Sequence, residues 1–146
     1  KAKSYLEGLT LLASMRLCAN VPTQYAIQTA LGGYQSINDL VAEGGRLKKQ
    51  RDMIHQRLID MPGVSCVKPK GSLYVFPKID FKKFDIENDD AFTLDLLTEQ
   101  KVFVVAGSGF NCNSGQHFRI VFLPELDTLE LAANRISTFL NEKLKH

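Results

Sequence analysis

The sequence has few cysteines and no long apolar run, and each absence excludes a class of protein. Its three cysteines, Cys18, Cys66 and Cys112, are widely spaced and odd in number, and no Cys-x-x-Cys pair or Cys/His cluster has the spacing of a metal site. We therefore expect reduced thiols in a cytoplasmic protein and no bound metal. No run of 18 apolar residues occurs, so we expect no membrane-spanning helix and no membrane partner.

A strong excess of charge of one sign is also lacking. The 18 lysines and arginines nearly balance the 16 aspartates and glutamates. The net charge of +2 gives no electrostatic footprint for nucleic acid or an anionic membrane. A small basic run, formed by Lys48, Lys49 and Arg51, lies on a predicted helix beside Asp52, so we interpret it as a solvated face.

What is present suits an ordinary globular domain. Apolar residues make up 45% of the sequence and charged residues 23%, which excludes most disordered chains. A chain of 146 residues buries enough surface for one core. It starts Lys1-Ala2-Lys3, without methionine or a secretory signal, and from this start we expect a piece of a longer protein.

Three helices are predicted in the first part of the chain. The first is apolar on most sides, which requires neighbours on most sides. Pro22 disfavours helix at Val21 and suits the first turn of the second helix, which Gly32-Gly33 ends. Pro62-Gly63 ends the third helix. The three helices are predicted at residues 4–17, 23–31 and 46–61.

Short strands are predicted in the rest of the chain. The first two form a hairpin around the turn Pro69-Lys70-Gly71. Asn88 or Asp89 is available to cap a following helix, and a capping box at residues 127–130 opens the last helix. This order predicts an α+β fold, a small, mainly antiparallel sheet with helices packed on it. The predicted strands span residues 64–67, 72–79, 102–105 and 118–122, a helix spans 91–100, and a loop spans 106–115.

Arg119 is the leading candidate for a functional residue. Alternation along its strand places Phe118, Ile120 and Phe122 on one face, and Arg119 with Val121 on the other. A strand arginine is usually a solvated charge, but here a glycine- and asparagine-rich loop leads directly into the strand, as at many binding sites. A guanidinium binds a carboxylate through two parallel hydrogen bonds, which a lysine cannot reproduce. The residues alone leave carboxylate binding and a solvated charge both open.

Three other segments carry weaker signals. Gly71 offers a place where a ligand approaches the backbone closely, although a plain hairpin turn is the simpler interpretation. Residues 16–22 interrupt a helix, which either exposes polar groups toward a site or only separates two helices. The segment Gly107-Ser108-Gly109 resembles part of a phosphate loop, but no helix is predicted to begin after it, so we reject that interpretation.

Read in order, four blocks of sequence resemble the carboxy-terminal portion of class I and II pyridoxal-phosphate-dependent aminotransferases, in particular the bacterial alanine aminotransferase branch. The resemblance covers nearly the whole chain, and the first two blocks are the most specific. The blocks are LLASMRLCANVPTQ (residues 11–24), AIQTALGGY (26–34), GSLY with FPK (71–74 and 76–78) and HFRI (117–120).

The resemblance implies roles for four residues. Arg119 matches the family arginine that binds the substrate α-carboxylate. Gly71 and Tyr74 match the small-domain strand that lines the substrate side of the cleft. Arg16 lies near a position where some relatives carry a substrate-contacting arginine.

The resemblance also implies that this chain lacks the chemical centre of the enzyme. The family lysine that forms a Schiff base lies in a Ser-x-Ser-Lys-type motif, which is absent here and expected upstream. We therefore expect no catalytic residue and no bound pyridoxal phosphate on this chain alone. The parent enzyme binds pyridoxal phosphate and moves an amino group between an amino acid, alanine, and a 2-oxo acid such as 2-oxoglutarate. Residues 1–33 correspond to lead-in helices from the large-domain and interface region of a homodimer, and residues 34–146 to its small domain.

The alternative is a free-standing small α+β module that binds an amino acid. The first predicted helix distinguishes the two hypotheses, because a self-sufficient module does not begin with a helix that is apolar on most sides. A purely structural or dimerisation module is a poorer fit, since it does not need Arg119 between glycine-rich turns.

Overall fold

The structure, a computed structural model, describes residues 2–15, 20–112 and 115–144, and the chain divides into two compact units, Lys1–Ile37 and Asn38–His146. In the first unit, no described helical residue is buried. Its helices are α1 (Ala2–Ser14), α2 (Val21–Tyr25) and α3 (Ile27–Leu31), and α4 (Ser36–Val41) crosses the boundary between the units.

The helix predicted at residues 23–31 is two helices in the structure. Pro22 lies in the first turn of α2, as predicted, and α3 ends before Gly32. Between them the chain turns tightly at Ala26, whose N–H donates to the carbonyl of Thr23 at 3.1 Å. This three-residue spacing is that of a 3-10 turn, which interrupts the α-helical pattern.

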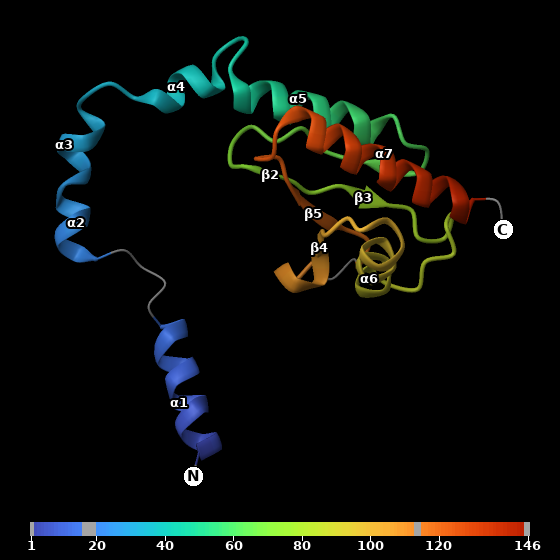
Figure 1. The fold of residues 1–146 in the computed structure, drawn as a ribbon, viewed down its shortest axis with the longest axis horizontal. Coiled ribbons are helices and arrows are strands. Elements are labelled where there is room, and N and C mark those ends of the chain that lie inside the picture. Colours follow the sequence, from blue (N-terminus) through green and yellow to red (C-terminus); the bar gives the residue numbers. More distant parts are fainter. Residues whose placement is uncertain (1, 16–19, 113–114, 145–146) are drawn as a thin grey trace. The chain divides into compact units, whose positions relative to one another are not determined.

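The described strands of the second unit all pair antiparallel (Figure 1). They form a two-stranded and a three-stranded sheet, and β5 is the central strand of the latter. This small sheet with packed helices agrees with the predicted α+β class. The pairs are β1 (Val64–Ser65) with β3 (Lys78–Ile79), and β5 (Phe118–Val121) with both β2 (Tyr74–Val75) and β4 (Val105–Ala106).

The predicted hairpin is only partly correct. The prediction makes residues 72–79 one strand, whereas the structure has β2 and β3, separated at Phe76 and Pro77. Pro77 has no N–H to donate to a strand ladder, and its carbonyl accepts the N–H of Phe118 at 3.2 Å. Only β3 pairs with β1, while β2 pairs with β5. Tyr74 therefore lies on the strand next to that of Arg119.

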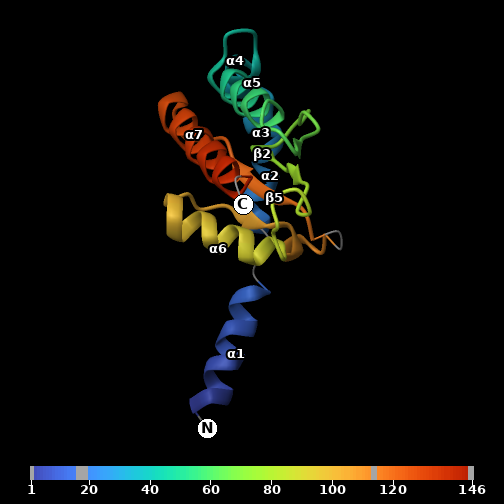
Figure 2. The same ribbon diagram turned by 90° about the vertical axis from the view of Figure 1, so that its right-hand side faces the viewer.

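Three helices complete the core of the second unit. Both views show α5 (Arg46–Ile59) and α7 (Leu126–Lys143) side by side, and α6 (Asp89–Gln100) contacts α7 and β4 (Figure 1, Figure 2). Truncation of one buried phenylalanine to alanine costs about 3–5 kcal/mol of unfolding free energy, so this core fixes the strands firmly. Its fully buried phenylalanines are Phe84, Phe92, Phe118, Phe122 and Phe139.

The ends of the last two helices show which capping predictions hold. Asn88 caps α6, because its side chain accepts the N–H of Ala91 at 2.8 Å, and Asp89 is left for another contact. The capping box predicted at residues 127–130 is wrong. The N-cap of α7 is Glu125, which makes no side-chain capping bond, so α7 begins before the predicted cap.

The strand predicted at residues 102–105 is also largely wrong. Val102 and Val104 are buried as predicted, but Phe103 is 77% exposed and the ladder with β5 starts only at Val105. The apolar side chains of this segment account for the burial of Val102 and Val104. Backbone pairing is a separate matter, because it depends on where the neighbouring strand ends.

Candidate functional site

Arg119 lies on the central strand of the three-stranded sheet. Phe118, Ile120 and the following Phe122 are buried, whereas Arg119 is half-buried and Val121 is exposed. This pattern confirms the alternation expected from the sequence. The side chain of Arg119 therefore lies on the face of the sheet that points away from the core.

Two aromatic rings contact the guanidinium of Arg119. Its Cζ lies 4.4 Å from the ring centroid of Tyr74 and 4.3 Å from that of Phe110. Contacts of this kind contribute about 0.5–2 kcal/mol each. Within the described residues, Arg119 has no ion pair, and its buried Nε has no hydrogen-bond partner. The structure therefore holds a positioned cation with an unused donor.

Phe76 and His117 extend this cluster. The rings of Phe76 and Phe110 meet edge to face, with 6.0 Å between centroids and an angle of 82°. Phe76 also stacks on His117, at 5.2 Å and 12°. We call these four rings and the guanidinium the Arg119 face. Its members are Tyr74, Phe76, Phe110, His117 and Arg119.

His117 does not add a second cation to this face near neutral pH. Burial lowers the pKa of its imidazole, and the nearby Lys78 cation lowers it further, against an opposite effect from Asp89. A second contact of the ring is to a thiol, since Nδ1 lies 3.4 Å from the Sγ of Cys112. The cationic group of the Arg119 face is therefore Arg119 itself.

The other predicted site residues do not all lie next to Arg119. Tyr74 contacts Arg119 directly. Gly71 lies in an exposed turn, where an added Cβ would meet no heavy atom within 4 Å, so its backbone is open to approach. Arg16 lies outside the described residues. Phe76 and Phe110 were not predicted as members of the site. The sequence signal for Phe110 is its place as an aromatic residue inside a glycine-rich loop, and the signal for Phe76 is its alternation with Tyr74.

The segment Gly107-Ser108-Gly109 is not a phosphate loop. It forms η1 (Gly107–Phe110), a single turn of 3-10 helix that ends at Asn111 in the left-handed conformation. No α-helix follows it before β5 among the described residues. The turn instead carries Phe110 to the guanidinium of Arg119.

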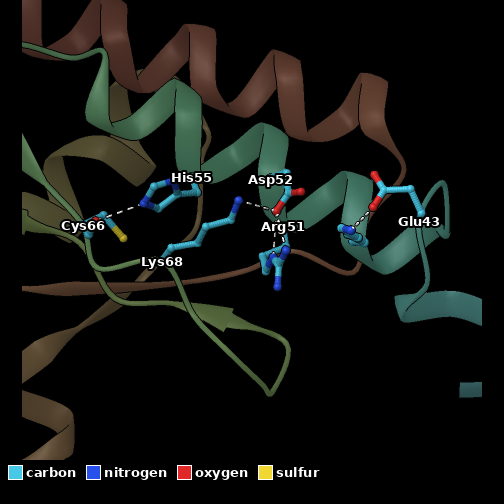
Figure 3. Close-up of polar contacts among 7 residues, drawn as sticks. Glu43, Arg51, Asp52, His55, Cys66 and Lys68 are labelled. Atoms are coloured by element: carbon cyan, nitrogen blue, oxygen red, sulfur yellow. Dashed lines mark hydrogen bonds and ion pairs between the residues drawn. The ribbon is translucent and has the colours of Figure 1, made fainter. Parts of the chain in front are cut away.

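A separate polar cluster lies on α5 and the chain after β1 (Figure 3). Asp52 pairs with Arg51 at 2.7 Å and with Lys68 at 2.9 Å, and the ring of His55 contacts the carbonyl of Cys66. Burial acts to raise the pKa of Asp52, but the hydrogen bonds from Lys68 and Arg51 outweigh it and hold this pKa below its ordinary value. These charges are paired within the chain, which agrees with the interpretation of a solvated face.

A pocket of about 480 Å³ lies beside the edge of the sheet. Residues 101–105, the apolar face of α7 and part of β5, including Arg119, line it. Tyr74, Phe76 and Phe110 are not among its walls, and its lining is mostly apolar. Arg119 is shared by this pocket and the Arg119 face, and we assign the candidate site to the Arg119 face, where the cation and the rings converge.

The described residues contain neither a metal-binding cluster nor a membrane-spanning helix. No group of three or more His, Cys, Asp or Glu side chains is placed there to hold a metal ion. None of the helices in that part of the chain is both long and apolar enough to cross a membrane.

Comparison with known sequences gives consistent matches. The family model of aminotransferase class I and II matches residues 4–136. The glutamate-pyruvate aminotransferase AlaA of Haemophilus influenzae is 56% identical over 141 residues, which are 97% of this chain and 35% of that relative. The alanine aminotransferase of Mycobacterium tuberculosis is 52% identical over 139 residues, which are 95% of this chain and 32% of that relative. The chain thus spans about a third of the length of these curated relatives.

Solved structures give similar matches. A crystal structure of an aminotransferase from Escherichia coli is similar with a TM-score of 0.78 and 56% identity, over 96% of this chain and 35% of the other. The alanine aminotransferase from Pyrococcus furiosus is similar with a TM-score of 0.68 and 38% identity, over 97% and 35%.

Proposed function

We propose, since this chain belongs to the class I and II aminotransferase family, that it is the carboxy-terminal part of a pyridoxal-phosphate-dependent enzyme and supplies the clamp for the substrate carboxylate. The enzyme moves an amino group between alanine and 2-oxoglutarate. These substrates are suggested by relatives named glutamate-pyruvate aminotransferase and alanine aminotransferase, because transfer from glutamate to pyruvate yields 2-oxoglutarate and alanine.

The observation that carries the proposal is that two rings hold the guanidinium of Arg119 while its Nε has no hydrogen-bond partner within the described residues. Every amino acid and 2-oxo acid in such a reaction has a carboxylate next to the reacting carbon, so one cation serves both halves of the exchange. Arg119 is fixed against Tyr74 and Phe110 and forms no ion pair within the described residues. A planar guanidinium held in this way offers two parallel N–H groups to a carboxylate.

The other site residues have supporting roles in this proposal. Tyr74 limits the rotation of the guanidinium, so less side-chain entropy is lost when substrate binds. Gly71 leaves its turn open to a substrate that approaches the backbone. Arg16, from its resemblance to the family pattern, is proposed as a second contact to substrate.

Pyridoxal phosphate supplies the electron sink of the reaction when it is bound. The lysines of this chain do not fit its covalent anchor. A reactive amine needs desolvation or a neighbouring cation to lower its pKa, and no lysine is buried in the part of the chain that the structure describes. We therefore place the anchor and the proton-transfer groups in the remainder of the enzyme, so the proposed part of this chain is to bind and orient the substrate.

The proposal extends to assembly and location. Residues 1–33 form lead-in helices at the large-domain and interface region, and residues 34–146 form the small domain of a homodimer. The enzyme is cytoplasmic, where a thiol such as that of Cys66 stays reduced. The competing hypothesis, a free-standing amino-acid-binding module, lacks support from α1, since no described residue of that helix is buried.

Substitution of Arg119 by lysine in the full-length enzyme tests the proposed clamp. Arg119→Lys keeps the charge but removes the two parallel N–H groups, so kcat/KM for alanine and for 2-oxoglutarate falls by at least ~10²-fold. The matched control is Arg57→Lys, because Arg57 is also half-buried but its guanidinium already pairs with Glu130, at 3.4 Å, outside the Arg119 face. Steady-state kinetics within a factor of about three of wild type for Arg119→Lys, as expected for the control, would remove the assignment.

A further inference from the structure

Asp89 is a buried carboxylate that neither the proposed clamp nor the helix cap uses. It is 3% exposed, and among the described residues it is the only acidic side chain in the buried class. It lies in the first turn of α6, where Asn88 already provides the cap. Burial of a carboxylate is unfavourable unless hydrogen bonds compensate for the lost water, so its contacts indicate why it is retained.

The contact that Asp89 makes is to the turn beneath the Arg119 face. Its Oδ2 accepts the backbone N–H of Ser108 at 2.6 Å, across 19 positions of the sequence. A charged acceptor makes a shorter and stronger bond than a neutral one. The first turn of α6 also favours a negative charge. Asp89 therefore ties the start of α6 to η1.

Backbone hydrogen bonds also fix the turn that Asp89 holds. The N–H of Gly107 donates to the carbonyl of His117 at 2.8 Å, and the N–H of Asn111 donates to the carbonyl of Ser108 at 2.9 Å. Gly107 approaches His117 so closely that an added Cβ would lie 2.7 Å from its carbonyl oxygen. Ser108 is thus the point at which a side chain from another element, α6, reaches the turn.

Phe110 connects this turn to the guanidinium. It is the last residue of η1 and is 43% exposed, so the core does not fix its ring. Its position depends on the backbone of the turn, and its ring centroid lies 4.3 Å from the Cζ of Arg119. A shift of Ser108 would move Phe110 away from Arg119. Among the described residues, Tyr74 would then be the one ring left in contact with the guanidinium.

We infer that Asp89 is a positioning residue for the carboxylate site: its buried carboxylate holds the 107–110 turn so that Phe110 contacts and orients the guanidinium of Arg119. This inference rests on the proposed function of Arg119 as the clamp. Loss of the contact weakens carboxylate binding equally in the ground state and the transition state, so KM rises while kcat changes little.

Kinetics of the full-length enzyme test the effect on binding. Asp89→Ala raises KM for both alanine and 2-oxoglutarate by about 10-fold and leaves kcat within about threefold, whereas Asp89→Asn, which keeps an acceptor oxygen, raises KM by no more than about threefold. The matched control is Asp90→Ala, which removes the same charge from the same helical turn at an exposed position and leaves both constants unchanged. An unchanged KM in Asp89→Ala, or a loss confined to kcat, overturns the inference.

NMR of the full-length enzyme without substrate separates this inference from the proposed function, because it needs no catalysis. Asp89→Ala accelerates exchange of the Ser108 amide and shifts the Nε–Hε resonance of Arg119 as the ring of Phe110 moves away, and Asp90→Ala does neither. If Asp89→Ala does not fold, the same measurements on Asp89→Asn test the inference. The Nε–Hε resonance of Arg119 then shifts in the same direction by a smaller amount.

An Arg119 resonance that stays unchanged while Ser108 exchange accelerates overturns the positioning role. If that resonance shifts but Arg119→Lys retains normal kinetics, the proposed function fails while the structural connection holds.

Discussion

At the scale of single residues, Arg119 lies on the outer face of β5 with its guanidinium against the rings of Tyr74 and Phe110. Alternation along β5 is enough to place the side chain on the outer face. Tyr74 reaches Arg119 only because β2 pairs with β5, and no local pattern specifies that pairing. Phe110 reaches it through a 3-10 turn whose place depends on Asp89, a contact between segments far apart in sequence. Local periodicity places the guanidinium on the outer face, whereas tertiary contacts determine how it is held.

Asp52 gives a residue-scale prediction with a defined pH dependence. Its pKa is lowered in the folded chain by Lys68 and Arg51. A lowered folded pKa means that the ion pairs stabilise the fold above the ordinary carboxyl pKa, and that this contribution is lost as the pH falls through the folded value. Because the side chain is 37% exposed, we expect Asp52→Asn to lower the free energy of unfolding by only about 0.2–1 kcal/mol at pH 7.

Urea unfolding at several pH values checks this expectation. The difference between Asp52→Asn and wild type shrinks as the pH falls below about 4, the ordinary range for aspartate. Glu142→Gln, which removes an exposed carboxylate outside this cluster, provides the control. A difference that grows as the pH falls contradicts the assigned direction of the pKa.

At the scale of elements, backbone chemistry explains where the predicted fold and the structure differ. The sequence indicates the existence of α5, α7 and β5, because each has apolar residues at the period of its structure, and of α6, because a capping residue precedes it. It does not indicate that Pro77 divides one predicted strand into two with different partners. Prolines and tight turns change which strands pair, and pairing partners are not encoded in the local period.

Close packing of η1 against His117, the residue before β5, gives an element-scale prediction. Gly107→Ala places a Cβ 2.7 Å from the carbonyl oxygen of His117 and 2.9 Å from its Cβ. The turn must then move, so we expect a loss of about 1–3 kcal/mol of unfolding free energy. Gly109→Ala makes the same chemical change in the same turn but meets no heavy atom within 4 Å. Denaturant unfolding that shows equal stability for the two variants would contradict the described packing of η1.

At the scale of the whole molecule, the two units differ in what they can bury. The second unit has a core with contributions from all three of its long helices. In the first unit, every described residue of α1 is exposed, including Leu6, Leu9 and Leu12. Contiguous apolar patches of more than a few hundred Å² are uncommon on soluble monomers, so we expect α1 to require a partner surface.

We therefore predict that the isolated chain self-associates, most simply as a two-fold dimer through α1, or that α1 frays. Each buried leucine contributes about 1.5–3 kcal/mol, so a few of them offset much of the cost of association. Analytical ultracentrifugation and hydrogen exchange measure both outcomes. Leu12→Lys reduces association, whereas Thr10→Lys on the same helix has little effect. A monomer at high concentration with strongly protected α1 amides contradicts the prediction and favours a self-sufficient domain.

The central claim is that Arg119 binds the substrate carboxylate. The most direct test is a crystal structure of the full-length enzyme with a non-reactive alanine analogue. The account predicts two hydrogen bonds of about 2.7–3.0 Å between the guanidinium of Arg119 and the α-carboxylate, with Tyr74 and Phe110 still in contact with the guanidinium. A carboxylate held by other residues, with no ligand atom within hydrogen-bond distance of Arg119, would contradict it.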